Sequence, residues 1–203
     1  MINYIKDEDL IGHIKDEYDY ILVPTNCYCR MSNGFSRKVK MLYPEVYHAD
    51  LKTKYGDENK LGDIIKVCTE EGPKFLIVYI NKGYNFRPDL KSDYLEYNSL
   101  EVVMKRISIE YKGCKIASPY IGCNKFDGNG DKDKVRDILE KYNKNIDLYI
   151  YDYIQKSRNE ELLETFKTEE VLKKTNYDEY KKTVSLRKEK AKKIKDKNKF
   201  AGY

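Results

Sequence analysis

The segment Phe75-Leu76-Ile77-Val78-Tyr79-Ile80-Asn81 constrains the fold more than any other part of the sequence. It is a nearly unbroken apolar run of strand length. A strand with one solvated face would alternate apolar with polar residues, so an unbroken run is typical of a strand inside a sheet. The sequence therefore predicts a sheet with residues 75–81 in its interior.

Further strands and helices are expected to alternate along the chain. Strands are expected at Asn3–Lys6, Tyr20–Pro24, Ile64–Cys68, Lys115–Pro119 and Asp147–Tyr151, and helices at Phe35–Tyr43, Pro44–Gly56, Asp93–Tyr111 and Lys134–Tyr142. Residues 8–18 fit either a helix or a wrapped connection. This alternation indicates crossover connections, and hence an α/β fold with a mixed, mostly parallel sheet and helices on both faces.

Size and composition exclude several classes of protein. A chain of 203 residues can bury about 70% of its surface, which is enough for one core. No stretch approaches ~18 apolar residues, so no membrane span is expected. The first nine residues mix apolar with acidic side chains and lack a hydrophobic signal region, which predicts a cytoplasmic location. Five cysteines without a Cys-x-x-Cys pair, and two distant histidines, argue against a disulfide framework and a metal site.

Charge is concentrated at the carboxyl end of the chain. Residues 156–203 carry 15 basic and nine acidic side chains, whereas the other residues carry 24 and 25. Residues 1–155 are therefore expected to form one domain and residues 156–203 a Lys-rich helical extension. The extension could bind nucleic acid or another acidic partner. The competing explanation is an A/T-rich genome, because Lys, Asn, Tyr and Ile all have A/T-rich codons.

Three unusual loops follow the strands expected to end near Val23, Asn81 and Pro119. The first loop comprises residues 25–36, the second residues 82–88 and the third residues 120–131. In sheets of this kind, ligands bind at the carboxyl ends of the strands. Glycine-containing loops that lead into helices suit phosphate groups, because free N–H groups and the helix dipole both favour an anion. Aromatic side chains in the same loops can stack on a base. The residues alone thus favour a nucleotide-like ligand.

The same loops, in this order, resemble those of a macro domain. Cys29-Arg30-Met31-Ser32-Asn33-Gly34 is similar to the motif Cys-Arg-Met-Gly-Ala-Gly of one branch, and Pro119-Tyr120-Ile121-Gly122-Cys123 to its Pro-Arg-Ile-Gly-Cys. That branch includes the terminal ADP-ribose protein glycohydrolase and the ADP-ribose 1″-phosphate phosphatases. The resemblance covers roughly residues 3–153. It implies a macro-like three-layer α/β/α domain that binds ADP-ribose or an ADP-ribosylated macromolecule and needs no cofactor.

The resemblance also implies two catalytic residues for hydrolysis of an ADP-ribosyl bond. Lys82 would be the nucleophile and Asp127 the base, although Asp127 requires one inserted residue and leaves Asp131 as a competitor. A free lysine has a pKa of about 10.4, so roughly one in 2,500 is neutral at pH 7. Burial or neighbouring cations would have to lower that value, and Arg87 and Lys125 are expected nearby.

The implied binding residues surround the expected ligand. In the family, an acidic residue accepts from the adenine amino group, which maps to Asp9, or to Asp7 if the gap falls elsewhere. Asn26 maps to the position that contacts the distal ribose, and Tyr151 or Tyr153 would pack on the adenine. The full set is Asp9, Leu10, Asn26, Arg30, Met31, Ser32, Asn33, Gly34, Phe35, Ser36, Tyr120, Ile121, Gly122, Cys123, Asn124, Lys125, Phe126, Tyr151 and Tyr153.

Several alternatives remain open at this point. Phosphate release from ADP-ribose 1″-phosphate, non-catalytic ADP-ribose binding, and nucleic-acid binding through the basic extension compete with hydrolysis. Lys82 could be a solvated residue at a strand end, and Asp127 an ordinary turn residue. Cys27 and Cys29 read as packing residues rather than nucleophiles. The acidic residues of 127–133 lack the glycine and glutamate that a calcium loop requires.

Overall fold

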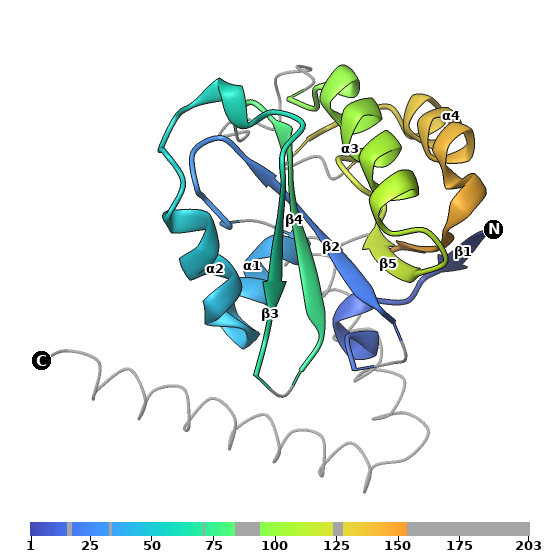
Figure 1. The fold of residues 1–203 in the computed structure, drawn as a ribbon, viewed down its shortest axis with the longest axis horizontal. Coiled ribbons are helices and arrows are strands. Elements are labelled where there is room, and N and C mark those ends of the chain that lie inside the picture. Colours follow the sequence, from blue (N-terminus) through green and yellow to red (C-terminus); the bar gives the residue numbers. More distant parts are fainter. Residues whose placement is uncertain (16–17, 33, 71, 84–93, 124–127, 154–203) are drawn as a thin grey trace, which may run out of the picture. The chain divides into compact units, whose positions relative to one another are not determined.

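The structure is a computed structural model that describes residues 1–15, 18–32, 34–70, 72–83, 94–123 and 128–153. In this part of the chain one sheet has the strand order β1-β6-β5-β2-β4-β3 (Figure 1). Its strands are β1 (Ile2–Lys6), β2 (Tyr20–Asn26), β3 (Ile64–Cys68), β4 (Lys74–Asn81), β5 (Lys115–Pro119) and β6 (Asp147–Asp152). Only β3 runs antiparallel to its neighbour. The carboxyl ends of the other five strands therefore share one edge.

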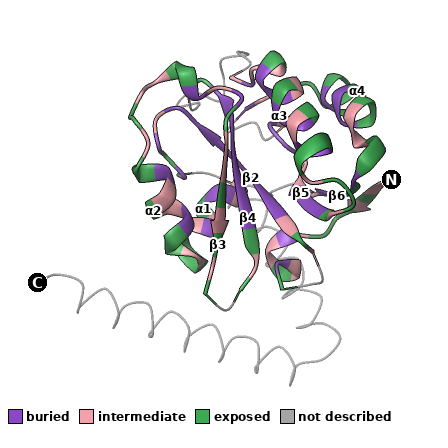
Figure 2. Cartoon of the chain, viewed as in Figure 1, coloured by how far each residue is buried: buried purple, intermediate pink, exposed green. Residues whose placement is uncertain are grey.

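Helices cover both faces of this sheet, so the expected mixed three-layer α/β/α architecture is confirmed (Figures 1 and 2). The helices are α1 (Gly34–Leu42), α2 (Pro44–Leu51), α3 (Tyr97–Glu110) and α4 (Lys132–Tyr142), with short 3-10 turns η1 (Leu10–His13), η2 (Glu58–Lys60) and η3 (Asn143–Asn145). Alternate residues of β4 enter two separate cores. Leu76 and Val78 pack with α3 and α4, whereas Phe75 and Ile77 pack with α1 and α2.

Strand β2 is longer than its sequence predicts. Pro24 was expected to end it, because proline has no N–H to donate to a sheet ladder. The β2–β5 ladder includes only Tyr20 and Ile21, whereas β2 stays paired with β4 up to Asn26. Past Ile21 the strand thus has one paired edge, where a proline is tolerated. The expected end at Pro24 was wrong for this reason.

Two helix boundaries also differ from expectation, and both differences shape the site. Helix α2 ends at Leu51 rather than Gly56, because the backbone N–H groups of Lys52 and Thr53 turn back to Ala49 and Asp50. Helix α3 starts at Tyr97 rather than Asp93. The residues before it are extended and pair with the end of β4 through a bridge between Asn81 and Leu95.

The expected boundary at residue 155 and the Lys-rich helical extension of residues 156–203 lie outside the described residues. Within the described ranges, no helix combines the length and the apolar character needed to cross a membrane.

Candidate functional site

The three loops singled out in the sequence meet at the carboxyl edge of the sheet. The N–H of Cys27, in the first loop, donates to the Asn81 carbonyl at the end of β4, over 3.2 Å. The carbonyl of Gly128, in the third loop, accepts from Tyr94 and Leu95 at 2.8 and 3.0 Å. Since Leu95 also bridges to Asn81, backbone contacts connect all three loops.

Lys82 is the first residue after β4 and its side chain is half exposed. Its backbone N–H donates to the carbonyl of Tyr94 at 3.2 Å, which fixes the residue beside the segment that leads into α3. Its Nζ lies 3.3 Å from Oε1 of Glu96, whose side chain is one-third exposed. The amine thus lies at the meeting point of the loops, next to a carboxylate.

Glu96 was not among the residues predicted for the site. The helix expected from Asp93 includes this position, and a glutamate is an ordinary residue in the first turn of a helix. In the structure Glu96 lies just before α3, and its N–H donates to the Ile80 carbonyl at 2.8 Å. This bond aligns Glu96 with the end of β4 and directs its carboxylate to Lys82.

Asp127, the expected base, lies outside the described residues. Its competitor Asp131 is described and caps the first turn of α4. Its carboxylate accepts from the backbone N–H groups of Asp133 and Lys134 at 2.8 and 3.1 Å. The bonds from Lys134 and Asp133, with that from Lys134 having the larger effect, lower the pKa of Asp131 below its ordinary value. Asp131 therefore has a helix-capping role, which weakens its case as a base.

The first loop is held by its own side chains. Asn26 is buried; its Oδ1 accepts from the Tyr28 N–H and its Nδ2 donates to the Arg30 carbonyl, both at 3.0 Å. Asn26, which was expected to contact the distal ribose, thus uses both atoms of its amide to shape the first loop. Met31 is also buried, whereas Arg30 and Ser32 are exposed.

The third loop folds back on itself through its glycines. The Gly130 N–H donates to the Gly122 carbonyl at 2.9 Å, and Gly122 has a φ of +70°. A Cβ on Gly128 would lie 2.1 Å from the same carbonyl oxygen, so only glycine fits there. Ile121, in the same loop, is buried. Cys123 is also partly enclosed, and its own burial raises the pKa of its thiol to about 12.

The residues expected at the adenine occupy two different environments. Asp9 caps η1 by accepting from the Ile11 N–H, and it forms an ion pair with Lys38 of α1. The Lys38 ammonium lies 5.2 Å from the ring centroid of Tyr153, which is 39% exposed. Asp9 and Tyr153 are thus brought together through Lys38, another residue that sequence reasoning missed.

Tyr151, the other expected adenine contact, is buried and its hydroxyl lies 2.7 Å from that of Tyr18. Asp7, the alternative to Asp9, has a φ of +61° and donates its N–H to the Asp152 carbonyl. Among the remaining expected residues, Leu10 and Ser36 are buried, and Gly34, Phe35 and Tyr120 are half-buried. Asn33, Asn124, Lys125 and Phe126 lie outside the described residues, as does Arg87.

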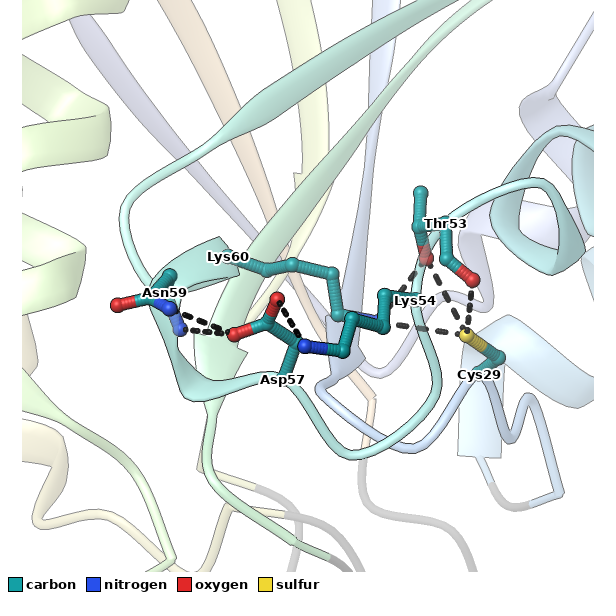
Figure 3. Close-up of polar contacts among 6 residues, drawn as sticks. All are labelled: Cys29, Thr53, Lys54, Asp57, Asn59 and Lys60. Carbon is teal, nitrogen blue, oxygen red and sulfur yellow. Dashed lines mark hydrogen bonds and ion pairs between the residues drawn. The ribbon is translucent and has the colours of Figure 1, made fainter.

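A network of largely buried polar groups contacts the first loop through Cys29. Lys60 donates to Sγ of Cys29 at 3.3 Å and to Oγ1 of Thr53 at 2.9 Å (Figure 3). The Tyr79 hydroxyl donates to Oδ1 of the fully buried Asp50 at 2.6 Å. The Thr53 hydroxyl donates to the Asp50 carbonyl at 2.7 Å, so these groups connect β4, the residues after α2 and the first loop.

Stability should depend on pH through Asp50. Burial raises the pKa of its carboxyl above the ordinary value, and the Tyr79 hydrogen bond opposes part of that rise. The folded state therefore holds this proton more tightly than the unfolded state does. The resulting stability is fully present below the unfolded-state pKa and is lost as the pH rises through the folded-state pKa. In thermal melts across this range, Asp50→Asn should remove that part of the pH dependence; an unchanged profile would contradict the assignment.

No group of three or more histidine, cysteine or acidic side chains that could hold a metal ion occurs in the described part of the chain.

No protein-family model and no curated protein matches this sequence. Solved structures do match its fold. The macrodomain of Mycobacterium tuberculosis DarG is 20% identical, with a TM-score of 0.57 over 76% of this chain and 99% of its own.

Two further structures give the same result. Thermosipho africanus DarTG, solved in complex with ADP-ribose, is 17% identical, with a TM-score of 0.58 over 76% of this chain and 43% of its own. A macrodomain protein from Streptomyces coelicolor is 15% identical, with a TM-score of 0.54 over 76% of this chain and all of its own. The resemblance stated from the loops is thus confirmed at the level of architecture: this chain has the macrodomain fold.

Proposed function

We propose that this protein binds ADP-ribose at the carboxyl edge of its sheet and hydrolyses an ADP-ribosyl linkage to an acidic side chain. The observation that carries this proposal is the position of Lys82. The side chain of Lys82 is half exposed, the residue directly follows the interior strand β4, and it lies where three glycine-containing loops meet. The binding of ADP-ribose by a structure of the same fold supports the ligand class.

In the proposed reaction, Nζ of Lys82 attacks the anomeric carbon of the ADP-ribosyl ester. The carbon–nitrogen bond forms, the ester bond between this carbon and oxygen breaks, and the acidic side chain leaves as a carboxylate. Water then displaces the nitrogen, which releases ADP-ribose and restores the amine. The attacking nitrogen has a proton to lose when its bond to carbon forms. Glu96, 3.3 Å away, holds the amine in place and offers an acceptor for that proton, and Asp127 remains the proposed base toward water.

Glu96→Gln tests the positioning role of this carboxylate. The amide keeps the shape of the side chain, and the backbone bond to Ile80 is unaffected. Loss of the negative charge should lower kcat for release of ADP-ribose about a hundredfold with KM unchanged, because proton transfer rather than binding is impaired. The rates are measured by mass spectrometry of released ADP-ribose.

Glu101→Gln is the matched control. Glu101 lies on α3 and pairs with Lys141 at 3.4 Å, in an exposed ion pair like that of Glu96. Exposed pairs contribute little to stability, so both variants should fold equally well. Equal rates for the two variants would remove Glu96 from the mechanism.

Two substrates separate the proposed hydrolase from its nearest alternative. A protein with glutamate-linked ADP-ribose and free ADP-ribose 1″-phosphate are each incubated with the full chain. Release of ADP-ribose from the protein supports the proposal. Release of inorganic phosphate alone would identify a phosphatase. Capture of the modified protein without turnover would identify an ADP-ribose reader.

A further inference from the structure

The contact between Cys29 and Lys60 has chemistry that the proposed reaction does not use. The Sγ and Nζ atoms lie 3.3 Å apart, and each also lies within 3.2 Å of Oγ1 of Thr53 (Figure 3). Cys29 is 4% exposed and Lys60 is 7% exposed. A thiol and a primary amine are thus held at reacting distance, with a hydroxyl beside both.

The surrounding structure fixes both partners. Lys60 ends the η2 turn, which Asp57 caps by accepting from the Asn59 N–H at 3.0 Å. Its ammonium also lies 4.8 Å from the ring centroid of Tyr79. Cys29 has a φ of +49°, a conformation that a non-glycine residue keeps only when its environment holds it there.

The Lys60 ammonium donates a hydrogen bond to the sulfur of Cys29. Lys60 forms no ion pair with any carboxylate that the structure describes, so Cys29 and Thr53 are its hydrogen-bond acceptors. An ammonium that donates to sulfur is also placed to give a proton to the oxygen that leaves when sulfur attacks a peroxide. No lysine donates to the sulfur of the neighbouring Cys27 within the described ranges, so this arrangement is specific to Cys29.

We propose that Cys29 and Lys60 form a covalent sulfur–nitrogen cross-link when the protein meets hydrogen peroxide. The thiolate attacks one peroxide oxygen, the S–O bond forms and the O–O bond breaks. The departing hydroxide takes a proton from the Lys60 ammonium and leaves as water. These changes produce a sulfenic acid beside a neutral amine.

The second step consumes both of these groups. The Lys60 Nζ attacks Sγ, the S–N bond forms, the S–O bond breaks, and the hydroxide leaves with an amine proton as water. One thiol, one amine and one peroxide thus become one sulfenamide and two waters. Lys60 acts first as the proton donor for O–O cleavage and then as the nucleophile. Its proximity to sulfur favours this route over further oxidation.

The cross-link would join the first loop to the residues that follow α2. Cys29 immediately precedes Arg30 and Met31 in the sequence, so the bond would restrain that loop from within. The bond itself depends only on the two side chains and on the peroxide. Its formation therefore does not rest on the proposed hydrolase function.

Peptide mapping of the full chain tests this proposal. The protein is treated with an equimolar amount of hydrogen peroxide, digested without reductant and analysed by mass spectrometry. The expected product is the Cys29 peptide joined to the Lys60 peptide, lighter than their sum by two hydrogen atoms. Dithiothreitol should separate the two peptides, since a thiol attacks the sulfur of a sulfenamide.

Two variants test whether Lys60 supplies the nitrogen atom of the cross-link. Lys60→Arg keeps a cation beside Cys29 but removes the amine, so its Cys29 should form sulfenic acid, and sulfinic acid with a second equivalent of peroxide, without a cross-link. Lys54→Arg, on the neighbouring exposed lysine, should cross-link as the wild type does. Irreversible oxidation of Cys29 in the wild type, or a Cys29 left unmodified while the exposed Cys68 is oxidised, would overturn the proposal.

Discussion

Lys82→Ala is expected to slow release of ADP-ribose from a glutamate-linked substrate roughly a thousandfold. The substitution removes the proposed nucleophile, and the side chain that alanine replaces is half exposed. Binding of free ADP-ribose should change little, because the loops that hold it are unaffected. Single-turnover assays measure the rate, and titration calorimetry measures the affinity.

Lys74→Ala is the control for this experiment. Lys74 is an exposed lysine at the amino end of β4, whereas Lys82 follows the carboxyl end of the same strand. Its loss changes the net charge equally and should leave the rate unchanged. A wild-type rate in Lys82→Ala would show that Lys82 is a solvated lysine at a strand end.

Gly128→Ala is expected to disrupt the third loop. The new Cβ would lie 2.1 Å from the carbonyl oxygen of Gly122, a distance at which backbone must move. That movement would weaken the bonds from Tyr94 and Leu95 to Gly128, and these bonds position the segment that contains Glu96. We expect a loss of about 3 kcal/mol in the free energy of unfolding, seen as a melting temperature lowered by about 9 °C.

The same variant should bind ADP-ribose at least about tenfold more weakly, since part of its binding surface is displaced. Gly113→Ala serves as the comparison, because Gly113 has open space around it and a φ of +81°. Its cost is the backbone strain alone, about 1 kcal/mol, with no loss of affinity. Equal behaviour of the two variants would mean that the third loop accommodates a side chain at residue 128.

The interior strand β4 and the order of elements could be predicted because they depend on local patterns. The apolar run at residues 75–81 forms β4 in the sheet interior, with its Phe75 and Leu76 in opposite cores. The end of β2 was predicted wrongly at Pro24. A proline is tolerated within this strand only because β5 stops pairing with β2 before Pro24. A ladder between residues nearly a hundred positions apart leaves no trace in the local sequence.

The candidate site could be predicted only in part, for a similar reason. Lys82 was identified through the resemblance to macro domains, which have a lysine at the position that follows this apolar strand. Glu96 was not, since its position depends on the extended segment before α3 and its bond to Ile80. The contact between Lys60 and Cys29 was equally invisible, because a buried lysine differs from a surface lysine only in its tertiary neighbours.

We expect ADP-ribose to bind where the loops after β2, β4 and β5 meet. Titration of ADP-ribose into the isotopically labelled full chain, followed by backbone amide NMR, locates the binding site. Saturable shifts are expected at Ile11, Met31, Lys82 and Ile121. None is expected at the amino ends of β2 and β4, where Tyr18, Thr69 and Pro73 line a separate cleft. Shifts confined to that cleft, or no shifts at all, would show that ADP-ribose does not bind at the carboxyl edge of the sheet.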